Sequence, residues 1–92
     1  MPTANEIRRI LTEKLDAAHI EIIDDSHRHA GHAGAKQGGH FTVKIVSNDF
    51  DGKSLTVRHK LVYAALDSLM KAKIHALTLK TLTPTEFKSF NV

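Results

Sequence analysis

The stretch of sequence that decides the fold is HFTVKIVSNDFDGKSLTVRHKLVYAAL, residues 40–66. Its first part alternates, with Phe41, Val43 and Ile45 on one side and mostly polar residues between them, which predicts a half-buried strand. The NDFDG segment that follows predicts a turn. Ser54 is then suited to cap a helix that carries a broad apolar stripe wide enough to cover a sheet. The stripe consists of Leu55, Val57, Leu61, Val62, Ala65, Leu66, Leu69 and Met70.

The segments before this stretch continue the pattern. Apolar residues at helical spacing predict a helix from Thr3 or Asn5 to Ala18. The β-branched residues of HIEIIDDS, residues 19–26, predict a short strand. Residues 27–39 contain four glycines and no large apolar residue, which predicts a mobile loop.

Two further elements follow the central stretch. IHALTLKTL, residues 74–82, alternates again and predicts a third strand. TPTEF, residues 83–87, predicts a short last helix, because Thr83 suits the N-cap and Glu86 stands three residues later as in a capping box. The predicted order is helix, strand, strand, helix, strand, helix.

This order predicts an α+β fold of two layers, with a small three-stranded mixed sheet and its helices on one face. The first two strands pair as an antiparallel hairpin, and the third returns parallel to a neighbour by a right-handed crossover. We expect one domain over residues 1–92, with a core at about residues 5–88 and a mobile loop at about residues 27–39.

Composition limits where a function can lie. A chain of 92 residues buries only about 60 to 65% of its unfolded surface, which favours a site on the surface or one shared with a partner. The net charge of +3 is spread along the chain and is a weak argument for nucleic acid. No cysteine is present, which excludes disulfides and thiolate ligands from this chain. No segment has the pattern of a signal peptide or a membrane span, so we expect a cytoplasmic protein without membrane contact.

Four of the seven histidines lie within residues 26–41, namely His27, His29, His32 and His40. Their H-x-H and H-x-x-H spacing lets a flexible loop bring imidazoles to one metal ion. Against this, ordering a glycine-rich loop costs entropy, and a structural zinc site normally needs four protein ligands. Solvated loop histidines are therefore the alternative interpretation, and we do not expect this loop alone to select zinc.

The other histidines carry weaker signals. We expect His40 to play a structural role at the edge of its strand, and His59 to be partly buried with a backbone hydrogen bond. His19 suggests only a surface or helix-end role. His75 lies in the third strand among small residues that leave one edge of its imidazole reachable, although a strand histidine is more often structural.

No catalytic motif is present. The sequence lacks G-x-S-x-G, H-E-x-x-H and a phosphate-binding loop. Asp24 and Asp25 lie near His27 and His29, but adjacent carboxylates at a strand end are common. We therefore expect that the protein is not an enzyme.

The chain resembles the BolA family from about Ile7 to Phe87. The resemblance is carried by DDSHRHAGH, by the whole of the central stretch and by IHALTLKTLTPTEF, in that order. It implies a fold similar to the class II KH domain. It also implies a heterodimer with a monothiol glutaredoxin that shares a bridging two-iron two-sulfur cluster, with glutathione bound through the partner and no cluster held by this chain alone.

The resemblance also implies which residues would ligate. The BolA side supplies the histidine of I-H-A-L, here His75, and a residue of the loop after the first strand. That loop residue corresponds to His29, three places after Ser26, with His32 and His27 in reserve. Imidazoles suit one edge of a shared cluster in a chain that has no cysteine.

The leading hypothesis is therefore an adaptor in iron–sulfur cluster trafficking or in iron and redox sensing. The alternative is a KH-like DNA-binding transcriptional regulator, whose basic candidates are Lys53, Arg58, Lys60, Lys71 and Lys73. Against it, KH domains clamp nucleic acid with a G-x-x-G loop between helices, and GHAG at residues 31–34 lies between two predicted strands. A plain protein-binding module and a weak homodimer are left open.

Overall fold

The computed structural model describes residues 3–25 and 39–90. The order of its elements confirms the predicted order, except that the second helix is divided in two and a short 3-10 helix precedes it. The elements are α1 (Thr3–Lys14), β1 (Ala17–Asp24), β2 (Gly39–Ser47), η3 (Asn48–Phe50), α2 (Leu55–Ala65), α3 (Asp67–Ala72), β3 (Ile74–Leu82) and α4 (Pro84–Phe90).

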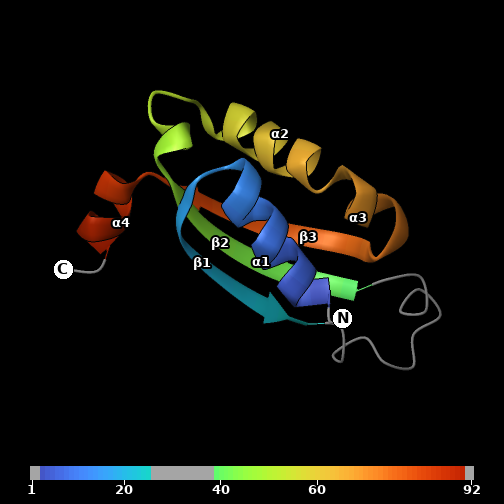
Figure 1. Cartoon of the computed structure of the whole chain (residues 1–92). Helices are drawn as coiled ribbons and strands as arrows, with labels where there is room; N and C mark the ends of the chain where they lie inside the picture. Colours follow the sequence, from blue (N-terminus) through green and yellow to red (C-terminus); the bar gives the residue numbers. More distant parts are fainter. Residues whose placement is uncertain (1–2, 26–38, 91–92) are drawn as a thin grey trace.

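The three strands form one mixed sheet in the order β1-β2-β3. β1 runs antiparallel to β2, with Ile20 opposite Ile45, and β3 runs parallel to β2, with Leu79 opposite Val43. β2 and β3 therefore begin at the same end of the sheet, as Figure 1 shows. The predicted α+β fold with a small mixed sheet is confirmed.

One face of the sheet is covered by α1, α2 and α3. Val43 and Ile45 of β2 pack in the same core as Ile7 of α1 and Val62 of α2, and all four side chains are fully buried. Removing a side chain of this size from water contributes about 1.5–3 kcal/mol. Burial on this face is therefore the main source of stability.

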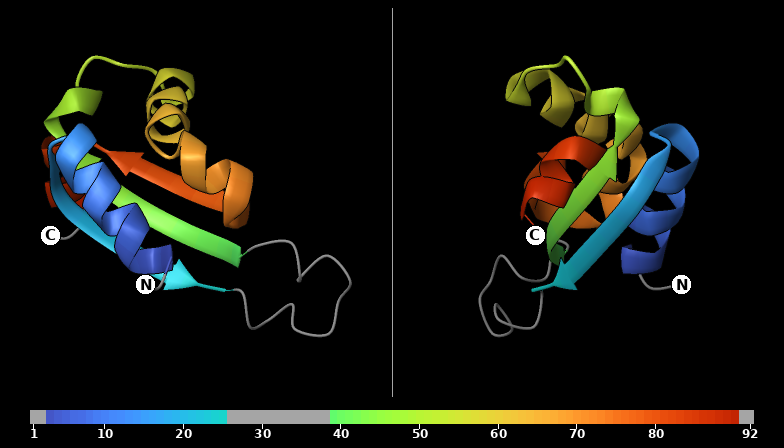
Figure 2. Two further views of the ribbon diagram at one scale, coloured as in Figure 1. Left: turned by 45° about the vertical axis from the view of Figure 1, so that its right-hand side comes forward. Right: turned by 90° about the vertical axis from the view of Figure 1, so that its left-hand side faces the viewer.

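The last helix, α4, packs on the opposite face, which corrects the prediction that all helices lie on one side. His19 and Lys44 alternate with the core residues Ile20 and Ile45, so their side chains point away from α1. The ring of Phe87 in α4 stacks on the ring of His19, with centroids 4.8 Å apart. The Lys44 ammonium lies 5.7 Å from the centroid of the Phe87 ring. Figure 2 shows α1 and α4 on either side of the sheet.

The first helix ends earlier than its apolar pattern predicted. α1 stops at Lys14, and Asp16 adopts a φ of 44°, a left-handed conformation that aspartate tolerates better than most residues. This reversal starts β1 at Ala17, before the predicted position at His19.

The apolar stripe of the second helix is narrower than predicted. Its first two members, Leu55 and Val57, are 62% and 42% exposed, whereas Val62, Leu66 and Leu69 are buried. The helix also breaks at Leu66, between α2 and α3. The first turn of α2 therefore projects beyond the core.

Candidate metal centre

His75 lies at the beginning of β3, on the open surface. Its neighbour Ile74 is opposite Gly39 at the start of β2, and the Gly39 N–H donates to the Lys73 carbonyl over 2.9 Å. The next matched pair is His40 with Ala76, so the register shift leaves His75 as an extra residue on β3. Its side chain is exposed, as the small neighbours in the sequence suggested.

The structure brings His40 beside His75, which the sequence interpretation did not predict. The two imidazole centroids are 5.1 Å apart and the ring planes are inclined by 45°. His40 is half-buried and is further fixed through its backbone, because its carbonyl accepts a 2.8 Å hydrogen bond from the Asp25 N–H. A signal existed: both histidines stand near the starts of their strands, the third strand was expected to run parallel to a neighbour, and parallel strands begin at one end of a sheet.

The loop candidates His27, His29 and His32 lie outside the described residues. The residues that flank this segment are placed: Asp25 follows β1 and Gly39 begins β2, at the end of the sheet that carries His40 and His75. Within residues 3–25 and 39–90, no three side chains of His, Asp or Glu gather into a metal site, and no pocket forms. The described residues thus place the exposed imidazole of His75 beside the half-buried ring of His40, and an exposed imidazole is a donor that fits a group completed by a partner.

The remaining histidines lie elsewhere. His19 is in β1, with Nε2 2.6 Å from Glu21 Oε2, at the end of the sheet beneath α4. His19 is the main cause of the lowered pKa of Glu21. His59 is half-buried on α2, but in the described part of the chain its side chain has no hydrogen bond, so the expected backbone bond is not seen.

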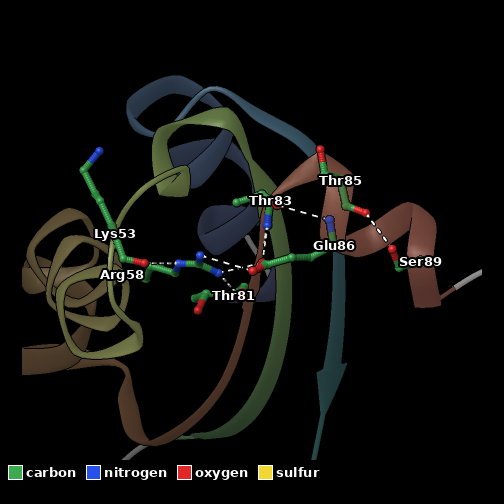
Figure 3. Close-up of polar contacts among 7 residues, drawn as sticks. All are labelled: Lys53, Arg58, Thr81, Thr83, Thr85, Glu86 and Ser89. Carbon is green, nitrogen blue, oxygen red and sulfur yellow. Dashed lines mark hydrogen bonds and ion pairs between the residues drawn. The ribbon is translucent and has the colours of Figure 1, made fainter.

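Arg58, a predicted nucleic-acid contact, is buried and bound within the protein, which corrects that assignment. Only 7% of the residue is exposed. Figure 3 shows its guanidinium between α2, β3 and α4. It donates to the carbonyls of Lys53 and Thr81 over 2.9 and 3.2 Å, and to the two carboxylate oxygens of Glu86 over 2.7 and 3.3 Å. A phosphate cannot reach donors that are already used in this way.

Glu86 also forms the predicted capping box of α4. Its Oε1 accepts from the Thr83 N–H over 2.8 Å, and its own N–H donates to Thr83 Oγ1 over 3.1 Å. The hydrogen bonds from Arg58, followed by that from the Thr83 backbone, lower the pKa of Glu86 below its ordinary value. We call the contact between Arg58 and Glu86 the clasp.

The other basic candidates are exposed lysines. Lys71 is paired with Asp67 at 3.1 Å within α3, and Lys73 with Glu6 at 2.8 Å. Among the residues that the structure describes, Lys53 and Lys60 form no ion pair. The Lys53 ammonium points away from the clasp (Figure 3). These two ammonium groups are the most available positive charges of the predicted set.

Fold and site together define a class: a cysteine-free α+β protein whose three-stranded mixed sheet presents two imidazoles where its parallel strands begin. The chain belongs to the BolA family, since the family model described as BolA-like protein matches residues 11–86. BolA-family proteins are named as regulators or as BolA-like proteins rather than as enzymes.

Three relatives illustrate the family. The chain is 41% identical to Protein BOLA1, chloroplastic, of Arabidopsis thaliana, over 94% of this chain and 56% of the relative. It is 41% identical to SufE-like protein 1, chloroplastic/mitochondrial, of the same plant, over 87% of this chain but only 23% of the relative. It is 37% identical to the DNA-binding transcriptional regulator BolA of Escherichia coli, over 89% of this chain and 80% of the relative.

The fold agrees with solved structures. BolA1 from Arabidopsis thaliana superposes with a TM-score of 0.82 at 40% identity, over 94% of this chain and 96% of that one. In the described part of the chain, no helix is both long and apolar enough to cross a lipid bilayer. The expected cytoplasmic location stays a prediction, because two of the relatives carry names that place them in organelles.

Proposed function

We propose that this chain is an adaptor that forms a heterodimer with a monothiol glutaredoxin and shares a bridging two-iron two-sulfur cluster with it. The observation that supports this proposal is His75, an exposed imidazole at the start of β3 in a chain that has no cysteine. An exposed donor of this kind is accessible to a group carried by a second protein. The proposed role is cluster trafficking or the sensing of iron and redox status.

The donor chemistry suits a shared cluster. Iron–sulfur clusters normally take four cysteine thiolates, but histidine replaces cysteine at one iron in Rieske centres. Here His75 would bind one iron, with His29 as the second ligand and His32 or His27 in reserve. The thiolates of the glutaredoxin and of glutathione would hold the other side. Neutral imidazoles reduce the negative charge around the cluster, which raises its reduction potential.

The proposal is tested by assembling the complex with and without the His75 imidazole. The chain is mixed with a monothiol glutaredoxin, glutathione, iron and sulfide, and visible circular dichroism is recorded together with the mass of the complex. We expect the His75→Ala variant to lose or shift the cluster bands. Its free energy of unfolding should change by less than about 0.5 kcal/mol, because the side chain is exposed.

His19→Ala is the matched control, since this histidine lies at the other end of the sheet, beneath α4. The control variant should give the wild-type spectrum. If the spectra of wild type and His75→Ala coincide, His75 is not a ligand. A failure of the wild-type chain to bind the glutaredoxin at all would contradict the heterodimer itself.

A second candidate function is DNA binding. It is favoured by the name of the Escherichia coli relative and by the exposed ammonium groups of Lys53 and Lys60, which form no ion pair with any residue that the structure describes. Affinity falls with salt, and each neutralised phosphate adds about 0.9 to the magnitude of the slope of log affinity against log salt. We therefore expect the Lys53→Ala, Lys60→Ala double variant to reduce the magnitude of that slope by about 2.

The slope is measured by fluorescence anisotropy of a labelled duplex between low and moderate salt. Lys71→Ala is the comparison, because its ammonium is already paired with Asp67. Equal slopes for wild type and the double variant would remove these lysines from the interface. An absence of binding at low salt would reject this second function.

A further inference from the structure

The third strand, β3, forms one edge of the sheet, because the strand order is β1-β2-β3. On its open side, two carbonyls of β3 accept hydrogen bonds from side chains of α2. The Tyr63 hydroxyl donates to the Leu77 carbonyl over 3.3 Å. The Arg58 guanidinium donates to the Thr81 carbonyl over 3.2 Å. Both carbonyls therefore point away from β2, and α2 supplies their donors.

The occupied carbonyls are the ones that a further strand would need. Unpaired backbone groups on an edge strand can pair with another chain, and in β3 these groups belong to alternate residues, namely Leu77, Leu79 and Thr81. If two copies paired antiparallel about Leu79, Leu77 would lie opposite Thr81 of the second copy. Pairing about Thr78 would place Leu77 opposite Leu79 of the second copy. Both arrangements need the Leu77 carbonyl as an acceptor, and Tyr63 already occupies it.

The opposite edge, β1, carries a contact of the same kind. The Asp25 N–H donates to the His40 carbonyl, so residues at odd spacing from Asp25, such as Ile20, direct their backbone groups away from β2. Arg8 of α1 donates to the Ile20 carbonyl over 3.0 Å. On each edge of the sheet, a helix on the core face thus sends a side-chain donor to an outward carbonyl.

We propose that α2 seals the free edge of β3 against pairing with a second copy of this chain, and that the Tyr63 hydroxyl is the separable part of this seal. Arg58 is buried and also binds Glu86, so its loss damages the fold, whereas Tyr63 is 39% exposed. Covering an edge strand is a known protection against aggregation. The seal needs neither a cluster nor DNA, and therefore goes beyond the proposed function.

The test measures the mass of the full chain by sedimentation velocity over a range of concentrations. Tyr63→Phe loses only the hydroxyl, and we expect it to associate at a concentration on the order of 25-fold below that of wild type. Each of the two copies no longer has to break one hydrogen bond, which is worth about fivefold. Val57→Ala is the matched control, because Val57 is a similarly exposed residue of α2 that donates no hydrogen bond. It should behave as wild type.

A spin label on Thr78→Cys identifies the surface of contact, because the chain has no other cysteine. Thr78 is exposed, and pairing about Thr78 or Leu79 brings the two labelled positions within about 8 Å of each other. We expect dipolar broadening of the spectrum when Tyr63→Phe is added to the labelled chain. Adding Val57→Ala instead should give no broadening.

Two results would overturn the proposal. One is a Tyr63→Phe variant that keeps the mass of wild type at every concentration. The other is association without dipolar broadening at position 78, which would place the contact on a surface other than the edge of β3.

Discussion

Replacing Arg58 with alanine is expected to lower the free energy of unfolding by about 3 kcal/mol, because the change removes four hydrogen bonds to buried or partly buried acceptors. The carbonyls of Lys53 and Thr81 lose their donor, and Glu86 loses its cation. For a domain of this size, such a change lowers the melting temperature by roughly 12–24 °C. Urea unfolding followed by far-ultraviolet circular dichroism measures the loss.

Arg9→Ala provides the matched control, because Arg9 forms an exposed ion pair with Glu13 at 3.3 Å within α1. An exposed pair of this kind contributes about 0.3–0.5 kcal/mol. If Arg58→Ala unfolds at the same urea concentration as Arg9→Ala, the clasp does not stabilise the fold. A double-mutant cycle with Glu86→Gln separates the ion pair from the two carbonyl contacts.

The clasp also predicts the direction of the acid response. Arg58 lowers the pKa of Glu86 in the folded chain below its ordinary value of 4.5. The stabilisation from this carboxylate is therefore complete above that ordinary pKa, and it is lost as the pH falls through the lower pKa of the folded state. The stability difference between wild type and Glu86→Gln should accordingly narrow in acid below pH 4.5.

The expected loss of stability in Arg58 variants affects the interpretation of DNA-binding experiments. A fall in DNA binding by an Arg58 variant would report a damaged fold, since the guanidinium is buried against Glu86. Lys53 and Lys60 are exposed and carry no such structural role. Variants of these lysines therefore separate a nucleic-acid contact from a folding defect.

Replacing Phe50 with alanine is expected to cost about 3–5 kcal/mol, the range for large aromatic side chains in a core. Phe50 ends η3 and is fully buried against the residues that α1, α2 and β2 contribute to the core. A domain of this size has a total stability of about 5–10 kcal/mol, so the variant will be close to unfolding at room temperature. Urea or thermal unfolding measures the effect.

Phe50→Leu keeps the position measurable if the alanine variant does not fold, because it retains much of the buried volume and should cost less than the alanine change. Leu55→Ala is the control from the same region, since Leu55 is 62% exposed and its loss should change stability by less than about 0.5 kcal/mol. Equal effects of Phe50→Ala and Leu55→Ala would contradict the assigned core.

Much of the fold could be predicted because strand alternation and helix caps are local signals. The alternation of Phe41, Val43 and Ile45 located β2, and Thr83 with Glu86 located the start of α4. Phe50 was assigned only to a turn, because a single apolar residue among polar ones has no period. Its burial depends on where η3 meets the core, which is a tertiary property.

The histidine pair shows the limit of sequence reasoning at the site. His75 could be singled out from its strand and from the resemblance to the BolA family. The place of His40 depends on the pairing of two strands that are distant in the sequence and on the register shift beside Gly39. Residue pattern alone does not determine such a register.

Arg58 was misassigned for a related reason. An arginine that is followed by His59 and Lys60 in a helix is normally solvated, and the burial of Arg58 depends on the distant Glu86. That partner lies on α4, the element whose face of the sheet was also wrongly predicted. The wrong face for α4 and the wrong role for Arg58 have one cause: after β3 the chain crosses to the other face of the sheet, where α4 places Glu86 within reach of Arg58.

The clasp has a consequence for how the molecule opens. Arg58 belongs to a helix on one face of the sheet, and Glu86 to a helix on the other, so the contact spans the end of the sheet and joins both layers. A short helix with few core contacts ordinarily opens independently of its domain. Here the detachment of α4 would leave a buried guanidinium without its anion, so α2 and α4 open as one cooperative unit.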